Sequence, residues 1–508
     1  MPRVLIPLRG RRVPFVTLTV WLSVVALSAH AQDRTAPSDL GDILLKKGII
    51  TPEELQQARE EERQKHAADE SRLDALLAKL PKWLDTISLF GDMRNRVEGF
   101  YGNNYHAETR FRLRARVGLN ANVSDEVSAT VRLATGDPND PISTNQTLSN
   151  TFNRKPFNLD WAYMTIKPGK TVGLEPGWGQ IVIGKFNVQL AKESELIWDD
   201  DLSPEGASET LNLVERREGF FRSFRLNALQ WEVNEASTNN DSYILGGQAV
   251  LDTAVGSTAT WSASFADYNF EGMNRVARTF LSPFTGKASP NNCTAAQLTL
   301  DPSSSCYAAN SSQNTSLANS NSVVLSGKDS AGNQEITGYV NGYNLINFGS
   351  ELDFPNPVGL GIPAGVFGDL VYNTQANSHN TGFVIGLGIG KAGKDWYHDS
   401  LKNAGDWGTS YCWEWVEKDA VVSLFSYSDF QYQQVNQFHN VSQKGSSNVT
   451  GSILRFDYML LPNFQLTVKS HFINALDSGI ATATSGKPLG LIGNSTLTRL
   501  QLDALMKF

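Results

Sequence analysis

The stretch that determines the fold class reads HAETRFRLRARVGLNANVSDEVSATVRLATGD, from residue 106 to residue 137. Every second residue from 110 to 116 is an arginine, and the residues between them are apolar or small. Side chains of an extended strand alternate between its two faces, so this pattern predicts a strand with one charged and one apolar face. A turn at Ser124 and Asp125 then reverses the chain, and a second alternating segment follows.

Four arginines on one strand face fit a water-filled space better than a packed core. A buried guanidinium needs a partner, and four in a row would need several. The solvated outer face of a soluble sheet would also accept them, so this strand alone leaves two interpretations open. The two ends of the chain help to decide between a soluble sheet and a barrel with an aqueous lumen.

The last segment, TRLQLDALMKF (498–508), alternates in the same way and ends on an aromatic residue. A soluble sandwich strand could show the same alternation, so the pattern is informative only together with the rest of the chain. The expected apolar face carries Leu500, Leu502, Ala504, Met506 and Phe508, and the expected polar face carries Arg499, Gln501, Asp503 and Lys507.

The first residues have the features of an export signal. Several arginines precede an apolar run at 13–29, and Ala29-His30-Ala31 has the small-x-small pattern of a cleavage site. We expect a cleaved signal peptide over residues 1–31, with an uncleaved membrane anchor as the alternative. No later apolar run approaches the ~20 residues of a membrane helix, but barrel strands need only ~10 residues each and show lipid only half of their side chains. A mean hydropathy of −0.28 is therefore compatible with a membrane barrel.

Composition excludes some partners and leaves the cysteines ambiguous. A net charge of −8 argues against nucleic-acid binding, which depends on clustered Lys and Arg. The 42 glycines and 10% aromatic residues suit a β protein with frequent turns. Cys293 and Cys306 could form a disulfide in an oxidising compartment or remain two isolated thiols, and Cys412 is left over.

Residues 32–82 contain the only clearly helical patterns. Thr51-Pro52-Glu53-Glu54 combines an N-cap, a proline at the first helical position and a capping-box glutamate. The very polar 59–72 stretch interrupts the apolar positions, which argues against a long coiled coil. We expect a short periplasmic helical segment.

Residues 83–508 show a period of two and predict an all-β membrane protein, an antiparallel transmembrane barrel of about sixteen strands. Short links alternate with longer ones, as expected for periplasmic turns and extracellular loops. The predicted strands are 86–98, 108–121, 126–136, 157–167, 180–188, 214–226, 229–236, 243–254, 258–270, 338–353, 364–374, 381–390, 407–417, 449–460, 464–474 and 495–508.

Several segments together resemble the putative porin family of bacterial outer-membrane barrels. They are LLKKGIITPEEL (44–55), GDMRNRVEGF (91–100), the arginine strand with VRLATGD after it, IWDDDLSPEG (197–206), VEKDAVVSLFSYSDF (416–430) and LQLDALMKF (500–508). The resemblance implies an outer-membrane location and passive passage of small hydrophilic solutes and ions. It also implies contact with outer-membrane lipid, recognition of Phe508 by the barrel-assembly machinery, and a homo-trimer by analogy with general porins.

The acidic stretch 189–213 is predicted to be the third extracellular loop. In general porins this loop folds into the barrel, so the resemblance implies a constriction in which its acids face arginines of the wall. Surface acids or a cation site are the alternatives. The constriction-loop candidates are Glu193, Glu195, Asp199, Asp200, Asp201 and Glu205, and the pore-lining candidates are Arg94, Arg96, Arg110, Arg112, Arg114, Arg116 and Arg132.

Enzymatic function is not expected. The GIGKAG segment (388–393) matches a dinucleotide fingerprint, but its alternating glycines fit a barrel strand entering a turn. No haem-attachment, zinc-protease or serine-hydrolase motif is present, and we expect neither a cofactor nor a metal. The leading interpretation is a water-filled channel, because about sixteen strands leave an aqueous lumen. The alternatives are an anchor or interaction protein acting through the N-terminal helices, and an outer-membrane hydrolase.

Overall fold

The structure is a computed structural model with two units, residues 1–82 and 83–508. It describes residues 47–48, 51–57, 60, 86–102, 107–148, 151–216, 218–235, 241–256, 258–277, 321–328, 334–357, 359–391, 401–432, 434–435, 442–443, 446–476 and 496–508. The predicted signal peptide, most of the predicted periplasmic segment, and both Cys293 and Cys306 lie outside these residues. Cys412 is a buried free thiol.

The first unit contains a helix over 52–57 whose start agrees with the sequence prediction. The backbone N–H of Thr51 donates to Glu54 Oε2 at 2.8 Å, and the backbone N–H of Glu54 donates to Thr51 Oγ1 at 3.2 Å. This reciprocal pair is a capping box, and it satisfies two N–H groups that the first helical turn leaves without partners. Among the described residues, no helix combines the length and apolar character needed to cross a membrane.

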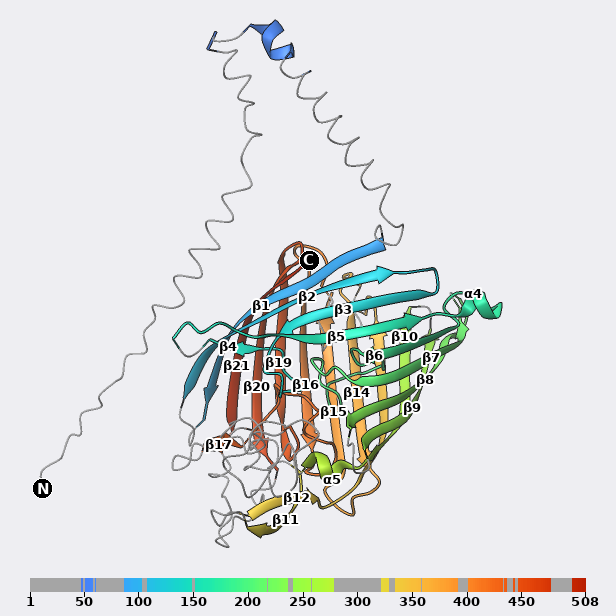
Figure 1. Cartoon of the computed structure of the whole chain (residues 1–508), viewed down its shortest axis with the longest axis vertical. Helices are drawn as coiled ribbons and strands as arrows, with labels where there is room; N and C mark the ends of the chain where they lie inside the picture. Colours follow the sequence, from blue (N-terminus) through green and yellow to red (C-terminus); the bar gives the residue numbers. More distant parts are fainter. Residues whose placement is uncertain are drawn as a thin grey trace, which may run out of the picture. The chain divides into compact units, whose positions relative to one another are not determined.

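The second unit is a closed antiparallel barrel (Figure 1). Its main sheet has 17 strands, of which the two-residue β4 (Gln146–Thr147) only adds to β2, so sixteen strands form the wall. They are β1 (Ile87–Tyr101), β2 (Glu108–Asn122), β3 (Val127–Thr135), β5 (Phe157–Ile166), β6 (Gly179–Lys185), β7 (Glu205–Glu215), β8 (Phe221–Asn234), β9 (Ser242–Val255), β10 (Ala259–Glu271), β13 (Tyr343–Phe354), β14 (Ala364–Asn373), β15 (Thr381–Gly390), β16 (Trp407–Val416), β19 (Val449–Leu461), β20 (Phe464–Ala475) and β21 (Leu497–Lys507).

Smaller elements lie in the connections. Two short helices are α4 (Gly169–Val172) and α5 (Met273–Val276). Two small two-stranded sheets pair β11 (Val323–Lys328) with β12 (Gln334–Tyr339), and β17 (Gln434–Val435) with β18 (Ser442–Gln443). Each wall strand pairs with its neighbours in chain order, and pairing of β1 with β21 completes the ring.

Strand side chains alternate between an apolar outer face and a polar inner face. In β19, Leu454, Phe456 and Tyr458 are exposed, whereas the intervening Arg455 and Asp457 are buried. Similar outward series of large apolar side chains occur on β5, β14 and β15, as expected for a lipid-facing barrel wall. The predicted alternation of period two is thus confirmed.

The core of the second unit lies inside the barrel. It contains Leu196, Ile197 and Trp198 of the connection 186–204, and Val421 and Phe425 of the connection 417–448. Both connections leave the same end of the barrel, opposite the short turns at 123–126 and 462–463. The interior is therefore partly filled by two folded loops.

One pair of predicted strands is wrong. The segments 214–226 and 229–236 were expected to be separate strands, but β7 ends at Glu215, β8 begins at Phe221, and residues 227–228 lie within β8. Residues 205–213, predicted as loop, belong to β7. The misleading signal was the acidic character of 205–209: Glu205 pairs with Lys185 at 2.8 Å, and Glu209 accepts a hydrogen bond from Gln230 at 3.0 Å. These neighbours on adjacent strands stabilise charges that sequence reasoning assigned to a loop.

The seam between β1 and β21 depends on a glycine. Gly91 and Phe508 exchange two backbone hydrogen bonds, of 2.9 and 3.0 Å. A Cβ atom on Gly91 would lie closest to the backbone carbonyl oxygen of Arg116 and 2.6 Å from Phe508 Cζ, so β2 and the aromatic ring together occupy the space that a side chain would need. An aromatic ring covering a strand glycine is a recurring way to pin register in β structures.

We therefore expect Gly91→Ala to weaken barrel closure. Either the ring of Phe508 or the strand must shift, and overpacking of this kind costs about 1–3 kcal/mol. The measurement is the temperature at which the compact gel band of unboiled, detergent-solubilised protein is lost. Gly368→Ala is the matched control, because the nearest atom to its new Cβ, the Val384 carbonyl oxygen, lies at 3.8 Å. Equal temperatures for the two variants would contradict the role assigned to Gly91.

Candidate functional site

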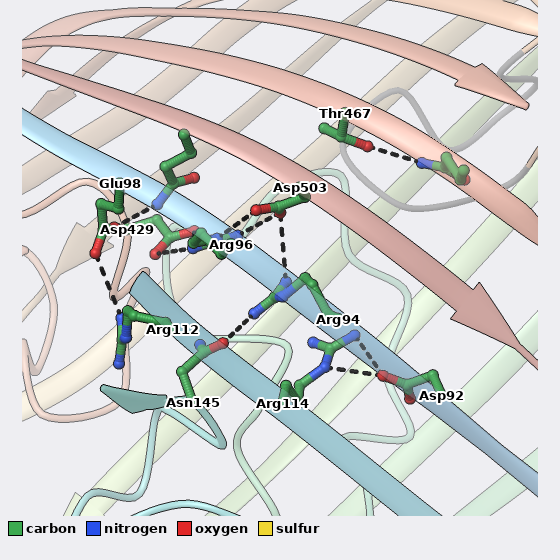
Figure 2. Close-up of polar contacts among 12 residues, drawn as sticks. Asp92, Arg94, Arg96, Glu98, Arg112, Arg114, Asn145, Asp429, Thr467 and Asp503 are labelled. Atoms are coloured by element: carbon green, nitrogen blue, oxygen red, sulfur yellow. Dashed lines mark hydrogen bonds and ion pairs between the residues drawn. The ribbon is translucent and has the colours of Figure 1, made fainter. Parts of the chain in front are cut away.

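Charged residues of β1 and β2 face one another inside the barrel (Figure 2). The antiparallel register places Arg94 opposite Arg114, Arg96 opposite Arg112, and an acid opposite the arginine at each end of the row. The end pairs are Asp92 with Arg116 and Glu98 with Arg110. The two like-charged pairs in the middle need acids from elsewhere in the fold.

Acids from β21 and from the 417–448 connection supply part of that charge. Arg96 bonds Asp503 through Nε at 2.7 Å and Asp429 through a terminal nitrogen at 3.0 Å. Arg499 binds Asp429 at 2.7 Å and also pairs with the fully buried Glu98. Figure 2 shows Arg96 between Asp429 and Asp503. Burial alone would raise the pKa of Asp429, but Arg96 and Arg499 hold this pKa well below its ordinary value.

The 186–204 loop supplies acid at the other end of the row. Asp201 lies 3.2 Å from Arg116 and 3.7 Å from Arg114, and Asp92 binds the same two arginines at 2.6 and 2.9 Å. Burial opposes ionisation of Asp201, but the two arginines lower its pKa to about 2. Asp201 therefore contacts the arginines directly and carries a negative charge at neutral pH.

Packing and hydrogen bonds hold this loop in the lumen. The Trp198 ring is 2% exposed, and its centroid lies 5.1 Å from that of Trp231, 5.3 Å from Tyr268 and 5.7 Å from Phe270. Aromatic contacts at these distances stabilise beyond simple area burial. The backbone N–H of Asp199 donates to the carbonyl oxygen of Phe425 at 2.8 Å. The 186–204 loop is thus held in place both by the barrel wall and by the 417–448 connection.

Two acids of the 186–204 loop occupy an environment that favours their protonated forms. Burial raises the pKa of Glu195, and the charges of Asp200 and Asp199 raise it further, to well above its ordinary value. Burial also raises the pKa of Asp199, and Asp201 adds to this effect, although N–H donors from Ser428 and Asp201 oppose it. Acids of one short loop are therefore pushed towards different charge states.

The charged groups surround a polar cavity of about 350 Å³. Arg132, which lies on the wall, pairs with Asp160 at 2.5 Å and stacks over the Trp161 ring at 3.1 Å from its centroid. Lys469 of β20 also lines the cavity. We call this cavity the narrow site; the predicted residues that line it are Arg94, Arg114, Arg116, Arg132, Glu195, Asp199, Asp200 and Asp201.

The remaining sequence candidates lie beside the narrow site or away from it. Arg96, Arg110 and Arg112 belong to the ion-pair network but do not line the cavity. Glu193 is in the loop without lining the cavity, and Glu205 lies on β7. Among the described residues, no group of acids, histidines or cysteines has the arrangement of a metal site.

Sequence reasoning missed several residues of this site. Asn145 accepts a hydrogen bond from Arg94 at 2.8 Å, and the backbone N–H of Thr144 donates to Asp201 at 3.1 Å. Asp429 and Tyr427 come from the 416–430 segment, which the sequence singled out only as a family motif. Asp503 was assigned to the inward face of its strand, which is the signal that could have suggested an ion pair.

Comparisons with known proteins give one family. The family described as "Putative porin" matches residues 100–438, which is more than half of the chain. No curated protein matches the chain significantly.

Three solved structures of outer-membrane proteins are similar to this chain at low sequence identity. OprB of Pseudomonas putida at high pH has 11% identity and a TM-score of 0.46, with 84% of this chain and 96% of that chain covered. An anion-selective porin from Comamonas acidovorans has 10% identity and a TM-score of 0.40, covering 83% and 99%. OmpF of Salmonella typhi in complex with daunomycin has 10% identity and a TM-score of 0.39, covering 83% and 97%. On the extent of the family match, this chain belongs to the putative porin family.

Proposed function

We propose that this porin conducts small hydrophilic solutes and ions passively across the outer membrane, and that the narrow site controls which of them pass. Family membership supports a channel rather than an enzyme. The observation that carries the proposal is the arrangement of the narrow site. Arginines of β1, β2 and β3 line one side, and acids of the 186–204 loop line the other. A site of this kind orients dipolar solutes and selects ions by charge.

The distribution of cavities supports a route through the barrel. The narrow site shares Asn187 with a second cavity of about 420 Å³. That cavity shares Lys167, Gln180 and Gln189 with a third, of about 400 Å³, which reaches Ser88 at the start of β1. The three spaces thus follow one another from the inward loops towards the short-turn end. We propose that solutes move along this series.

The charge balance of the narrow site favours anions. Six cationic and six acidic side chains line the cavity, and the two acids Glu195 and Asp199 have raised pKa values. These raised pKa values reduce the negative charge of the lining set and shift its balance towards positive charge. We propose weak anion selectivity at neutral pH and low salt, where screening is least.

Conductance of the purified protein in a planar bilayer tests the function, and its reversal potential in a salt gradient tests the charge balance. Arg94→Gln and Lys469→Gln should each lower the anion-to-cation permeability ratio about two- to fivefold, as expected for one charge close to the path. Asp200→Asn should raise the ratio. Asp125→Asn is the control, because this side chain is 82% exposed in a turn pair with Lys170.

Two outcomes of that experiment would count against the proposals. Absence of conductance in the wild-type protein would contradict the channel function itself. Unchanged selectivity in the three narrow-site variants, with normal conductance, would show that ions do not pass the narrow site.

Protonation of Glu195 should make the channel pH-dependent. A raised pKa means that its protonated form stabilises the docked loop fully below the ordinary pKa of 4.5, and that this stability is lost as pH rises through the raised value. We expect single-channel current to become noisier as pH rises from the ordinary carboxyl pKa of 4.5 through the raised pKa of Glu195. Glu195→Gln should remain quiet throughout, and Glu205→Gln on the outer face should behave as wild type. A pH response in the Glu195→Gln channel equal to wild type would contradict this role.

We also propose that residues 1–31 are a cleaved signal peptide, that the outer-membrane porin is a homo-trimer, and that Phe508 is the assembly signal read by the barrel-assembly machinery. Deletion of Phe508 should leave the chain protease-sensitive in the periplasm, because its ring and backbone bonds at Gly91 would be lost. Cell fractionation with added protease measures this. Conversely, Met506→Leu, at another outward position of β21, should insert normally. Full insertion of the Phe508 deletion would rule out the signal.

A further inference from the structure

The half of the lumen near the short turns has a different chemistry from the narrow site. Two cavities there, of about 420 and 400 Å³, share Lys167, Gln180 and Gln189. Their other lining residues come from the turn-side ends of β1, β2, β3, β5, β6, β7 and β8 and from the first residues of the 186–204 loop. We call the two cavities together the turn-side vestibule.

No carboxylate lines the turn-side vestibule within the part of the chain that the structure describes. Its only charged lining residues there are Lys167 and Arg225, and most of its other polar groups are amides and hydroxyls. The narrow site, by contrast, has an acid for every cation. Positive charge in the vestibule is therefore not neutralised locally.

Three donors in the vestibule have no protein partner among the described residues. Arg225 Nε is buried without a hydrogen bond, in a strand position opposite Asn212. Neither Lys167 Nζ nor the Gln180 side chain makes a hydrogen bond or ion pair within those residues. Leaving a guanidinium donor buried and unpaired is unfavourable, so an anion that binds there gains the full interaction. These donors suit a carboxylate group.

Neighbouring amides are held in fixed orientations that offer acceptors. Asn212 Nδ2 donates to the carbonyl oxygen of Gly177 at 2.6 Å, and Gln189 Nε2 donates to Asn187 Oδ1 at 2.7 Å. Within the described part of the chain no donor bonds the carbonyl oxygens of these two side chains, so they can accept from hydroxyl groups. Asn227 is fixed from both sides, by Thr210 at 3.0 Å and Gln248 at 2.9 Å. A pre-organised set of polar groups of this kind gives specificity at little entropic cost.

We propose that the turn-side vestibule is a binding site for small hydroxylated organic anions, such as sugar acids and hydroxycarboxylates. Lys167, Gln180 and Arg225 bind the carboxylate, and the amide oxygens of Asn212 and Gln189 accept hydrogen bonds from hydroxyl groups. The inference rests on the proposed function, because it assumes that solutes crossing the channel pass through the turn-side vestibule. Solutes that clear the narrow site are retained there before release at the short-turn end.

Competition by gluconate for the ion current tests this site in the full-length channel. Gluconate should reduce the KCl current in a saturable manner, whereas acetate, which lacks the hydroxyls, and glucose, which lacks the charge, should each act at least about tenfold more weakly. Arg225→Gln and Lys167→Gln should each raise the half-blocking gluconate concentration about tenfold, measured against the KCl current of the same variant. Asn212→Leu should weaken gluconate block and leave acetate block unchanged. Lys170→Gln is the matched control, because Lys170 is 73% exposed and lines neither cavity.

Each result bears on one claim. Loss of all conductance in the wild-type protein contradicts the proposed function. Normal conductance without saturable gluconate block, or with equal block in Arg225→Gln and Lys170→Gln, overturns the vestibule site alone. Equal potency of acetate and gluconate overturns the role of the hydroxyl groups. The folded gel band of each variant before heating shows that a change in block does not reflect misfolding.

Discussion

The buried ion-pair network around Arg96 and Glu98 is the constraint on which the rest of the barrel depends. Two arginines face each other across β1 and β2 at two successive levels, and burying such charges without partners would cost several kcal/mol for each ion. The fold meets this requirement when β21 brings Asp503, the 417–448 connection brings Asp429 and the 186–204 loop brings Asp201. Wall closure and loop docking are thus parts of one electrostatic arrangement.

The 186–204 loop and the 417–448 connection depend on each other because each is anchored to a different part of the wall and the two are hydrogen-bonded together. Trp198 fixes the 186–204 loop against β8 and β10, whereas Asp429 fixes the other connection against β1 and β21. Between these anchors, Ser428 donates its backbone N–H to Asp199 at 2.7 Å. A substitution at either anchor should therefore be felt in both loops, and the width of the narrow site is a joint property of the two.

Much of the wall could be predicted from the sequence, because alternation of period two is a local signal. It identified the inward arginines of β2, the polar face of β21 and the total of sixteen strands. It failed at β7, where Glu205 and Glu209 on the outer face resembled a loop. The ion-pair partners of the arginines could not be predicted, because they are determined by strand register and by how the loops dock. Arg96 and Asp503, for example, are 407 positions apart in the chain. The sequence drew attention to the acids of the 186–204 loop but not to their different states. Asp201 contacts arginine directly, whereas Glu195 favours its protonated form. This difference depends on burial, which sequence spacing does not reveal.

Pairing of β1 with β21 also has a kinetic consequence. Contacts between segments so distant in sequence form slowly, because the whole intervening chain must be confined first. Until then both strands present unpaired N–H and C=O groups, which are templates for unwanted pairing with other chains. During this interval the arginines of β1 lack Asp503 of β21 as an ion-pair partner. The open sheet is therefore prone to aggregation and carries unpaired positive charge. A protein with this topology should depend on a folding helper that shields two edges at once, and its slowest folding step should be the joining of those edges.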